Sequence, residues 1–231
     1  MIQESISITL PAYNEKDNLK DVVLEALSVV KKITSDYEIL IVDDGSTDGT
    51  KEIADSLAKE YPNVKVLHHK KNLGFGGAIK SCYRNATKDL VFLSPADKQV
   101  NMENLNDFVK AIEGKDAVLG YRKSRPEKKL RIITSKVFHF LLKLMFGLNF
   151  KEMSASLLFR RKALDVPMKS KSAFLSAEVL YRIKKNGGKF GSTLIDYYPR
   201  TQGEEKGNKI SVILKTCKDL FKLWYLLKIK E

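Results

Sequence analysis

The sequence predicts an α/β fold in which helices cover both faces of a mostly parallel sheet. Strand-like and helix-like segments alternate through the first half of the 231 residues, which is typical of parallel strands joined by crossover helices. Hydrophobic residues make up 43% of the chain, enough to form a core. Polar clusters follow four of the strand-like segments, and ligands of such sheets bind at the carboxyl ends of the strands.

The elements of the first half follow in a regular order. Short apolar or alternating runs predict strands at 5–10, 37–44, 64–69, 90–93 and 117–121. Apolar residues at helical spacing predict helices within 19–30, 53–58 and 105–112. A glycine-rich loop at 72–77 leads into a further helix.

The second half is basic and then apolar. Six lysines and arginines within 122–131 precede an amphipathic segment, 132–150. A strand at 154–159, a helix around 174–185 and a strand-like run to Tyr198 follow. We expect one domain over 1–206 and an amphipathic basic helix over 207–231, packed on the domain or on a membrane surface. Core packing is the alternative for both amphipathic segments.

The formal net charge of +13 indicates an anionic partner or a merely basic solvated surface. Nucleic acid, an anionic membrane surface and a phosphorylated substrate are the candidate partners, and the acid-rich strand ends argue against nucleic acid. The two cysteines do not have the spacing of a disulfide framework or of a zinc site, so neither is expected. We expect a reducing compartment. No signal peptide and no membrane span of about 18 apolar residues is expected.

The segment VDDGSTDGT places two acids at the end of a buried strand. Strand alternation sends Asp43 and Asp44 to opposite sides, so one can face a ligand while the other holds local backbone. A carboxylate there can accept hydrogen bonds from a base or a ribose. The competing interpretation is that Ser46 and Asp48 only cap the next helix.

Two other loops are open to two interpretations each. In LPAYNE, Asn14 and Glu15 stand at the start of a helix, whose free N–H groups suit an anionic or uracil-like ligand, or they are plain caps. The glycines at 74, 76 and 77 match neither a dinucleotide fingerprint nor a P-loop. They predict either close approach of a ligand or a tight turn.

The segment PADKQ delivers a single carboxylate to a strand end. Mg²⁺ often takes one or two protein carboxylates, with substrate phosphates and water as its other ligands. Asp97 and Gln99, two positions apart, can share such a site with a diphosphate. A plain turn is the alternative.

Four motifs follow one another along the chain: LPAYNE, VDDGSTDGT, the glycine-rich loop NLGFGGAIKSC and PADKQ. In this order and spacing they resemble family 2 glycosyltransferases, especially the branch of dolichyl-phosphate mannose synthase and other polyprenyl-phosphate glycosyltransferases. The resemblance covers about residues 5–206. It implies a GT-A fold, a UDP- or GDP-linked sugar as donor, Mg²⁺ or Mn²⁺ as cofactor, and inversion of the anomeric centre.

The resemblance also implies roles for individual residues. The nucleotide-sugar-binding set is Pro11, Tyr13, Glu15, Asp44, Asp97, Arg200 and Lys206. Within it, Asp44 contacts the base or ribose, and Arg200 and Lys206 belong to a late motif that closes over the diphosphate. The metal ligands are Asp97 and Gln99. The catalytic set is Asp97, Arg122 and Arg131, whose arginines hold phosphate, and Glu178 matches a further family position.

Three departures from the family pattern affect the metal and acceptor sides. Pro95 stands where the metal motif has its first acid, and Glu205 replaces a serine of the late motif. In an acceptor-side pattern, Lys151, Ala155 and Ser156 replace an acid, a glycine and an aromatic residue. Nucleotide binding is therefore better supported than metal geometry or acceptor choice.

The expected activity is sugar transfer from the nucleotide donor to a polyprenyl phosphate, on the cytoplasmic side at the inner face of the membrane. A hydroxyl acceptor needs a general base, and no further acid stands out as one, whereas a phosphate needs none. The basic 122–131 segment can hold the lipid phosphate, while 132–150 and 210–230 rest on the membrane. The alternatives are a saccharide or protein hydroxyl acceptor, and a non-catalytic relative that binds nucleotide sugar.

Overall fold

A twisted sheet forms the centre of the protein in the computed structural model, which describes residues 1–123, 140–150, 156–172, 174–198, 218–225 and 227. Among these residues seven strands pair in the order β3-β2-β1-β4-β6-β5-β7. Their bounds are β1 Ile6–Ala12, β2 Tyr37–Asp43, β3 Val64–His68, β4 Leu90–Leu93, β5 Ala117–Arg122, β6 Leu157–Arg160 and β7 Phe190–Ile195. Strand β6 runs antiparallel to both neighbours, and the other pairs are parallel, so the predicted mostly parallel sheet is confirmed.

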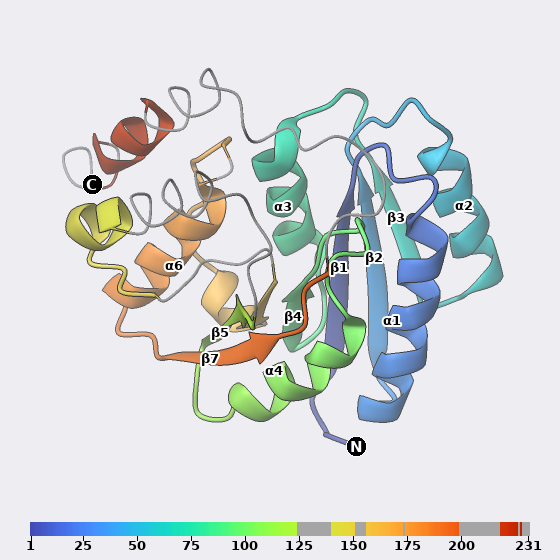
Figure 1. Cartoon of the computed structure of the whole chain (residues 1–231), viewed down its shortest axis with the longest axis horizontal. Coiled ribbons are helices and arrows are strands. Elements are labelled where there is room, and N and C mark those ends of the chain that lie inside the picture. The colour runs from blue at the N-terminus through green and yellow to red at the C-terminus, as the bar shows by residue number, and fades with distance from the viewer. Residues whose placement is uncertain (124–139, 151–155, 173, 199–217, 226, 228–231) are drawn as a thin grey trace.

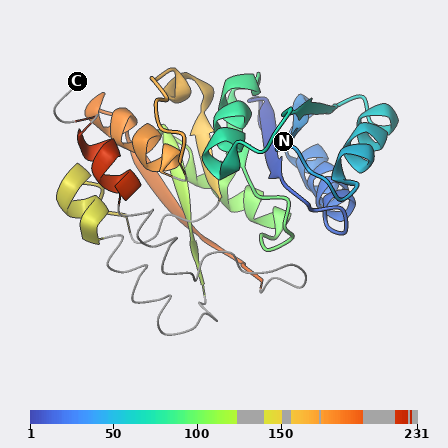
Figure 2. The same cartoon turned by 90° about the horizontal axis from the view of Figure 1, so that it is seen from above.

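Helices cover both faces of the sheet (Figures 1 and 2). Their bounds are α1 Leu19–Ile33, α2 Thr50–Glu60, α3 Gly74–Asn85, α4 Leu105–Ala111 and α6 Leu175–Lys185, with short 3-10 turns at Met102–Asn104 and Arg161–Leu164. Strand alternation divides the core in two. For example, Ile39 and Ile41 of β2 pack with α1, α2 and α4, while Leu40 and Val42 pack with α3 and α6.

Two further helical segments, 140–146 and 218–225, lie side by side next to α6 in both views (Figures 1 and 2). Leu142 and Phe146 of the first and Leu220 and Leu223 of the second are buried in the α3–α6 core. One face of each segment therefore packs in the core, which was the alternative to membrane contact. The predicted division between 206 and 207 lies outside the described residues and stays a prediction.

None of the helices in the described ranges is both long enough and apolar enough to span a membrane.

Candidate functional site

The carboxyl ends of β1, β2 and β4 lie together at the upper edge of the sheet in Figure 1. Backbone hydrogen bonds continue beyond the strands there: the Asp44 N–H donates to Ala12 O over 2.9 Å, and the Ala96 N–H donates to Pro11 O over 3.3 Å. The predicted residues Pro11, in β1, and Asp44 and Asp97, in the loops after β2 and β4, therefore lie along one edge of the sheet. This is the position at which parallel sheets bind ligands.

The β1–α1 and β2–α2 loops are bonded to each other and are called the loop pair below. Asn14, in the left-handed region at φ 56°, is at its centre. The loop-to-loop bonds are Asn14 N–H to Ser46 Oγ at 3.0 Å, Thr47 N–H to Asn14 Oδ1 at 2.9 Å, Glu15 N–H to Thr50 Oγ1 at 2.8 Å and Lys16 N–H to Asp48 Oδ2 at 3.2 Å. The amides after Tyr13 are thus held by the neighbouring loop.

Asp48 has a structural role within the loop pair, as the capping interpretation expected. Its Oδ1 accepts the backbone N–H of Thr50, the first residue of α2, over 3.0 Å and the Thr50 hydroxyl over 2.6 Å. Burial raises the pKa of Asp48, but the hydrogen bonds from Thr50 and Lys16 outweigh it and lower the pKa overall. Asp48 therefore holds the start of α2 as a carboxylate.

Glu15 is 8% exposed and lies just before α1. Its Oε2 accepts a hydrogen bond from Asn18 Nδ2 over 2.8 Å. The carboxylate is therefore oriented by the helix start that follows it.

Asp43 and Asp44 point to opposite faces of the sheet, as strand alternation predicts. Each meets one of two consecutive histidines at the end of β3, where Asp43 pairs in register with His68. We call the four side chains the Asp–His ladder: Asp43, Asp44, His68 and His69. Its first rung is Asp43 with His68, and its second rung is Asp44 with His69. The two rungs connect the sheet to different helices.

The first rung faces α2. His68 Nδ1 lies 2.9 Å from Asp43 Oδ2, and His68 Nε2 lies 2.9 Å from Asp55 Oδ1. Burial lowers the pKa of His68, but the hydrogen bonds to Asp55 and Asp43 outweigh it, so the pKa is raised overall. Asp43 Oδ1 also accepts the Ser46 N–H over 3.0 Å, so Asp43 holds local backbone.

The second rung faces α3. His69 Nδ1 lies 2.6 Å from Asp44 Oδ1, and His69 Nε2 lies 2.8 Å from Ser81 Oγ. The Leu73 N–H donates to the same Asp44 oxygen over 2.9 Å. The side chains of Asp44 and His69 are 3% and 8% exposed. Sequence reasoning missed both histidines, although two histidines ending one strand beside two aspartates ending its neighbour are the visible signal.

Two glycines allow backbone segments to approach closely at this edge. A Cβ on Gly45, at φ 72°, would lie 2.8 Å from Asn72 N, and a Cβ on Gly76 would lie 2.0 Å from Ser172 O. The contacts that require glycine at these two positions are therefore with the protein's own backbone.

Asp97 and Gln99 lie in the loop after β4. The Gln99 N–H donates to Asp97 Oδ1 over 3.1 Å. The Gln99 side chain reaches the segment after β7, where its Oε1 accepts from the Tyr197 hydroxyl over 2.9 Å and its Nε2 donates to Tyr198 O over 3.3 Å.

Arg122 ends β5 beside the same segment. Its guanidinium carbon lies 4.9 Å from the centre of the Tyr197 ring, a cation–π contact. Tyr197 thus connects Arg122 with the loop that carries Asp97. The other predicted phosphate-binding residues, Arg131, Arg200 and Lys206, lie outside the described residues, as do Lys151 and Glu205.

The residues present fit a cation whose ligands come mostly from substrate. Within the described ranges, no three His, Cys, Asp or Glu side chains cluster as a metal site. Asp97 is only partly buried at the strand end and has one oxygen bonded to the Gln99 amide. One protein carboxylate with diphosphate and water is a common arrangement for Mg²⁺.

Glu178 is fully buried and organises a different loop. Its carboxylate accepts the backbone N–H of Lys169 at 2.9 Å and of Ser170 at 2.6 Å. Arg182 Nε and Nη2, one helical turn later, each lie 3.0 Å from Glu178 Oε1. This loop is the one whose Ser172 packs on Gly76, so Glu178 links α6 to the start of α3.

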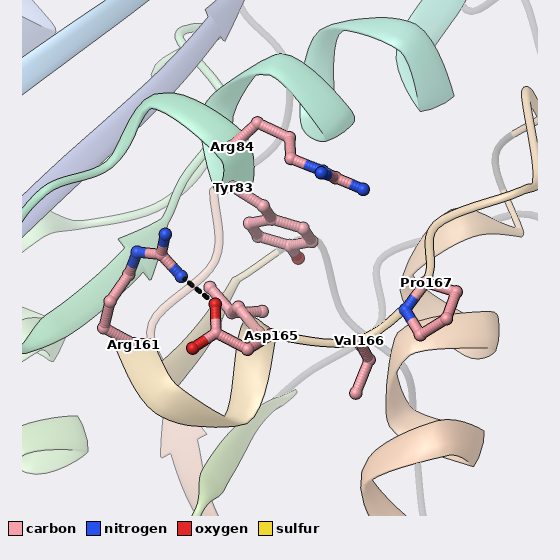
Figure 3. A pocket seen from close by; sticks show the side chains of 7 residues that line it. Tyr83, Arg84, Arg161, Asp165, Val166 and Pro167 are labelled. Atoms are coloured by element: carbon pink, nitrogen blue, oxygen red, sulfur yellow. Dashed lines mark hydrogen bonds and ion pairs between the residues drawn. The ribbon is translucent and has the colours of Figure 1, made fainter.

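A pocket of about 380 Å³ lies between the end of α3 and residues 161–167 (Figure 3). Arg161 Nη1 donates to Asp165 Oδ1 over 3.0 Å at its wall. Since Arg160 pairs with Leu90, the first residue of β4, this pocket is at the opposite edge of the sheet. It contains none of the predicted site residues.

Known proteins resemble both the sequence and the fold. Glycosyltransferase AglD of Haloferax volcanii is 25% identical over 97% of this chain and 38% of its own length. The undecaprenyl-phosphate 4-deoxy-4-formamido-L-arabinose transferase of Shewanella sediminis is 29% identical over 90% of this chain and 63% of its own length. The chain thus spans less than two thirds of both relatives.

Glucosyl-3-phosphoglycerate synthase from Mycobacterium tuberculosis superposes with a TM-score of 0.74 at 15% identity, covering 96% of this chain and 80% of the synthase. At that identity the match concerns the fold alone, and it confirms the expected GT-A type. The model of the family named glycosyl transferase family 2 matches residues 7–167. Because that match takes in well over half of the sequence, the chain belongs to glycosyl transferase family 2.

Proposed function

We propose that this chain is an inverting glycosyltransferase that moves a sugar from a nucleotide diphosphate sugar to a polyprenyl phosphate at the cytoplasmic surface of a membrane. The observation that carries the proposal is the meeting of the Asp44 and Asp97 loops at the carboxyl edge of β1, β2 and β4. This edge offers a carboxylate for the nucleoside and a carboxylate for a diphosphate-bound cation on adjacent loops.

The relatives support each half of the reaction. The Shewanella sediminis relative is named for an undecaprenyl-phosphate substrate, which supports a polyprenyl phosphate acceptor. Glucosyl-3-phosphoglycerate synthase has been crystallised with Mn²⁺ and UDP-glucose, which supports a nucleotide sugar donor and a divalent cation. In our proposal, Pro11, Tyr13 and Glu15 line the nucleotide pocket.

Asp97, together with Gln99 Oε1, would hold Mg²⁺ or Mn²⁺. The ion would supply positive charge against the leaving diphosphate. Arg122, Arg131, Arg200 and Lys206 would add fixed charge around the phosphates through charge-assisted hydrogen bonds.

The acceptor phosphate makes a general base unnecessary. One of its anionic oxygens forms the new bond to the anomeric carbon while the bond from that carbon to the diphosphate oxygen breaks. The nucleoside diphosphate leaves with the bonding electron pair, and no proton has to move. Attack from the face opposite the leaving group inverts the anomeric centre.

The helical segments 140–146 and 218–225 offer a face for the membrane. Phe140 and Leu144, four positions apart, are 63% and 71% exposed, and Phe221 and Tyr225 are 64% and 50% exposed. Lys143, Lys218 and Lys222 are exposed on the same two segments. Apolar side chains flanked by lysines are typical of helices that lie in the interface of an anionic bilayer. The apolar face is the name used below for four exposed side chains, Phe140, Leu144, Phe221 and Tyr225.

The test is product analysis with UDP- and GDP-sugars, Mg²⁺ or Mn²⁺, and either a polyprenyl phosphate or a saccharide as acceptor. We expect a lipid-linked sugar of inverted configuration that Asp97→Asn abolishes. Asp107→Asn, which alters an exposed carboxylate 3.4 Å from Lys110, is the matched control and should keep full activity. Transfer to the saccharide alone would assign a hydroxyl acceptor. Nucleotide-sugar binding without turnover would assign a non-catalytic role.

A further inference from the structure

The two carboxylate oxygens of Asp44 are in different situations. Oδ1 lies 2.6 Å from His69 Nδ1 and accepts the Leu73 N–H over 2.9 Å. Those two bonds use both lone pairs of that oxygen. Within the part of the chain that the structure describes, no residue donates to Oδ2. A carboxylate this deeply buried is stable when its second oxygen also meets a donor, so Oδ2 is the oxygen left for a ligand.

His69 is itself held in place. Ser81 Oγ lies 2.8 Å from Nε2, so the arrangement is satisfied when Ser81 donates to Nε2 and the proton on Nδ1 is donated to Asp44. The imidazole is 8% exposed, and Ser81 belongs to α3. A helix, a histidine and the Leu73 amide therefore fix the orientation of the Asp44 carboxylate before any ligand binds.

We infer that His69 and the Leu73 N–H restrict Asp44 to a single acceptor oxygen for the base, and that this selects a uridine nucleotide as the donor. The inference rests on the proposed function, because it assumes that Asp44 faces the base of a nucleotide sugar. It deepens that function by naming the base, and it assigns His69 as the positioning residue.

Hydrogen-bond chemistry separates the candidate bases. Uracil presents one N–H, at N3, which matches one acceptor oxygen. Guanine presents two adjacent donors, N1–H and the N2 amino group, which a carboxylate pairs best through both of its oxygens. With Oδ1 saturated, one guanine donor would remain unsatisfied in a buried site. Cytosine has the size of uracil but carries a lone pair at N3, which Oδ2 would repel.

The test measures the affinities of UDP, CDP and GDP for the full chain by calorimetry with Mn²⁺ present. We expect UDP to bind at least about tenfold more tightly than CDP or GDP, the factor typical of one buried charge-assisted hydrogen bond. GDP or CDP binding as tightly as UDP would overturn the inference and leave the proposed function intact. Failure of all three nucleotides to bind would overturn the proposed function as well.

Asp44→Asn gives the sharper result, because the donors from His69 and Leu73 force the amide oxygen into the Oδ1 position. The amide NH₂ then faces the base as a donor, which suits N3 of cytosine and opposes N3–H of uracil. We expect the preference to pass from UDP to CDP. Equal losses for both nucleotides, with the UDP preference unchanged, would show that Asp44 does not read the base.

Two substitutions at His69 test its positioning role. In His69→Asn the amide nitrogen lies near the place of Nδ1 and can still donate to Asp44, whereas His69→Leu removes the donor at similar volume. We expect the ratio of UDP to CDP affinity to be kept by the asparagine variant and to fall about tenfold in the leucine variant. His68→Asn alters the other rung of the ladder and should keep the ratio. Equal ratios in all three variants would exclude a positioning role for His69.

Discussion

The hydroxyl of Tyr197 donates a hydrogen bond to Oε1 of Gln99 over 2.9 Å. The same ring lies under the Arg122 guanidinium, 4.9 Å from its carbon. One aromatic side chain after β7 therefore fixes both the loop that carries the proposed metal ligand Asp97 and an arginine of the proposed phosphate site.

Tyr197→Phe should remove one hydrogen bond to the Gln99 side chain while keeping the ring under Arg122. We expect kcat/KM to fall about fivefold, because a neutral hydrogen bond contributes about 1 kcal/mol. Steady-state kinetics at saturating Mn²⁺ measure this effect. Tyr198→Phe, which removes an exposed hydroxyl 3.3 Å from Asn101 Nδ2, is the control. Equal rates for both variants and the unaltered protein would show that Gln99 needs no fixed position.

Pro95→Asp should restore the acid that the family metal motif has at this position. A second carboxylate two residues before Asp97 adds charge and an oxygen ligand, so the Mn²⁺ concentration for half-maximal activity should fall about tenfold. Titration of activity with Mn²⁺ measures it, with Pro95→Ala as the control for loss of the proline ring. An unchanged titration would mean that position 95 is not a ligand position.

Glu178→Gln should destabilise the fold by about 3 kcal/mol, the lower end of the range for breaking a buried ion pair. The variant removes the negative charge that faces Arg182, and the NH₂ group of the new glutamine can face the Lys169 and Ser170 amides. Urea unfolding measures the loss. Glu103→Gln, at an exposed pair 3.6 Å from Lys32, should change stability by less than about 0.5 kcal/mol. Similar small losses at both sites would contradict a buried, fully paired Glu178.

The first rung of the Asp–His ladder should make stability depend on pH. The pKa of His68 is raised in the folded state by Asp55 and Asp43, against the effect of burial. Its contribution is therefore complete below the unfolded pKa of about 6.5 and is lost as pH rises through the higher folded pKa. The free energy of unfolding of the unaltered protein should decline across this window relative to His68→Gln. Parallel curves for the two proteins would show that His68 is not stabilised in its charged form.

The apolar face should carry membrane binding. Phe140→Ser combined with Leu144→Ser should weaken sedimentation with vesicles that contain anionic lipid by about tenfold or more, since each change removes an exposed apolar side chain. Leu194→Ser, at a 42% exposed leucine on β7, is the matched control and should bind normally. Unchanged sedimentation of the double variant would rule out this face as the membrane contact.

The strands of the first half were predictable because each carries its own pattern. The pattern predicted a strand over 37–44, with an apolar run from Ile39 to Val42 that ends in acid, and β2 ends one residue earlier, at Asp43. The direction of β6 was not predictable, because an antiparallel and a parallel strand with two buried faces share the same apolar run. The direction of a strand depends on the side from which the chain enters the sheet, and the apolar run of β6 does not indicate that side.

The candidate site was predictable in its acids and not in their partners. Asp44 follows from a strand ending in a turn, but its contact with His69 depends on the register between β2 and β3, which lie 20 residues apart. The glycine-rich loop was expected to allow close approach of a ligand or to form a tight turn, whereas the atom that approaches Gly76 belongs to Ser172, 96 residues later. The contact between Gly76 and Ser172 arises from the assembled sheet and leaves no local signal in the sequence.

The loop pair has a consequence for the thermodynamics of the donor binding that we propose. Four hydrogen bonds join the segments after β1 and β2, and two of them involve Asn14, which is held at a positive φ. The wall beside Asp44 is thus assembled by the protein itself, and a nucleotide that docks there has little chain to immobilise. Less of the contact free energy is then offset by lost conformational entropy, so a small nucleoside can be held firmly by few contacts.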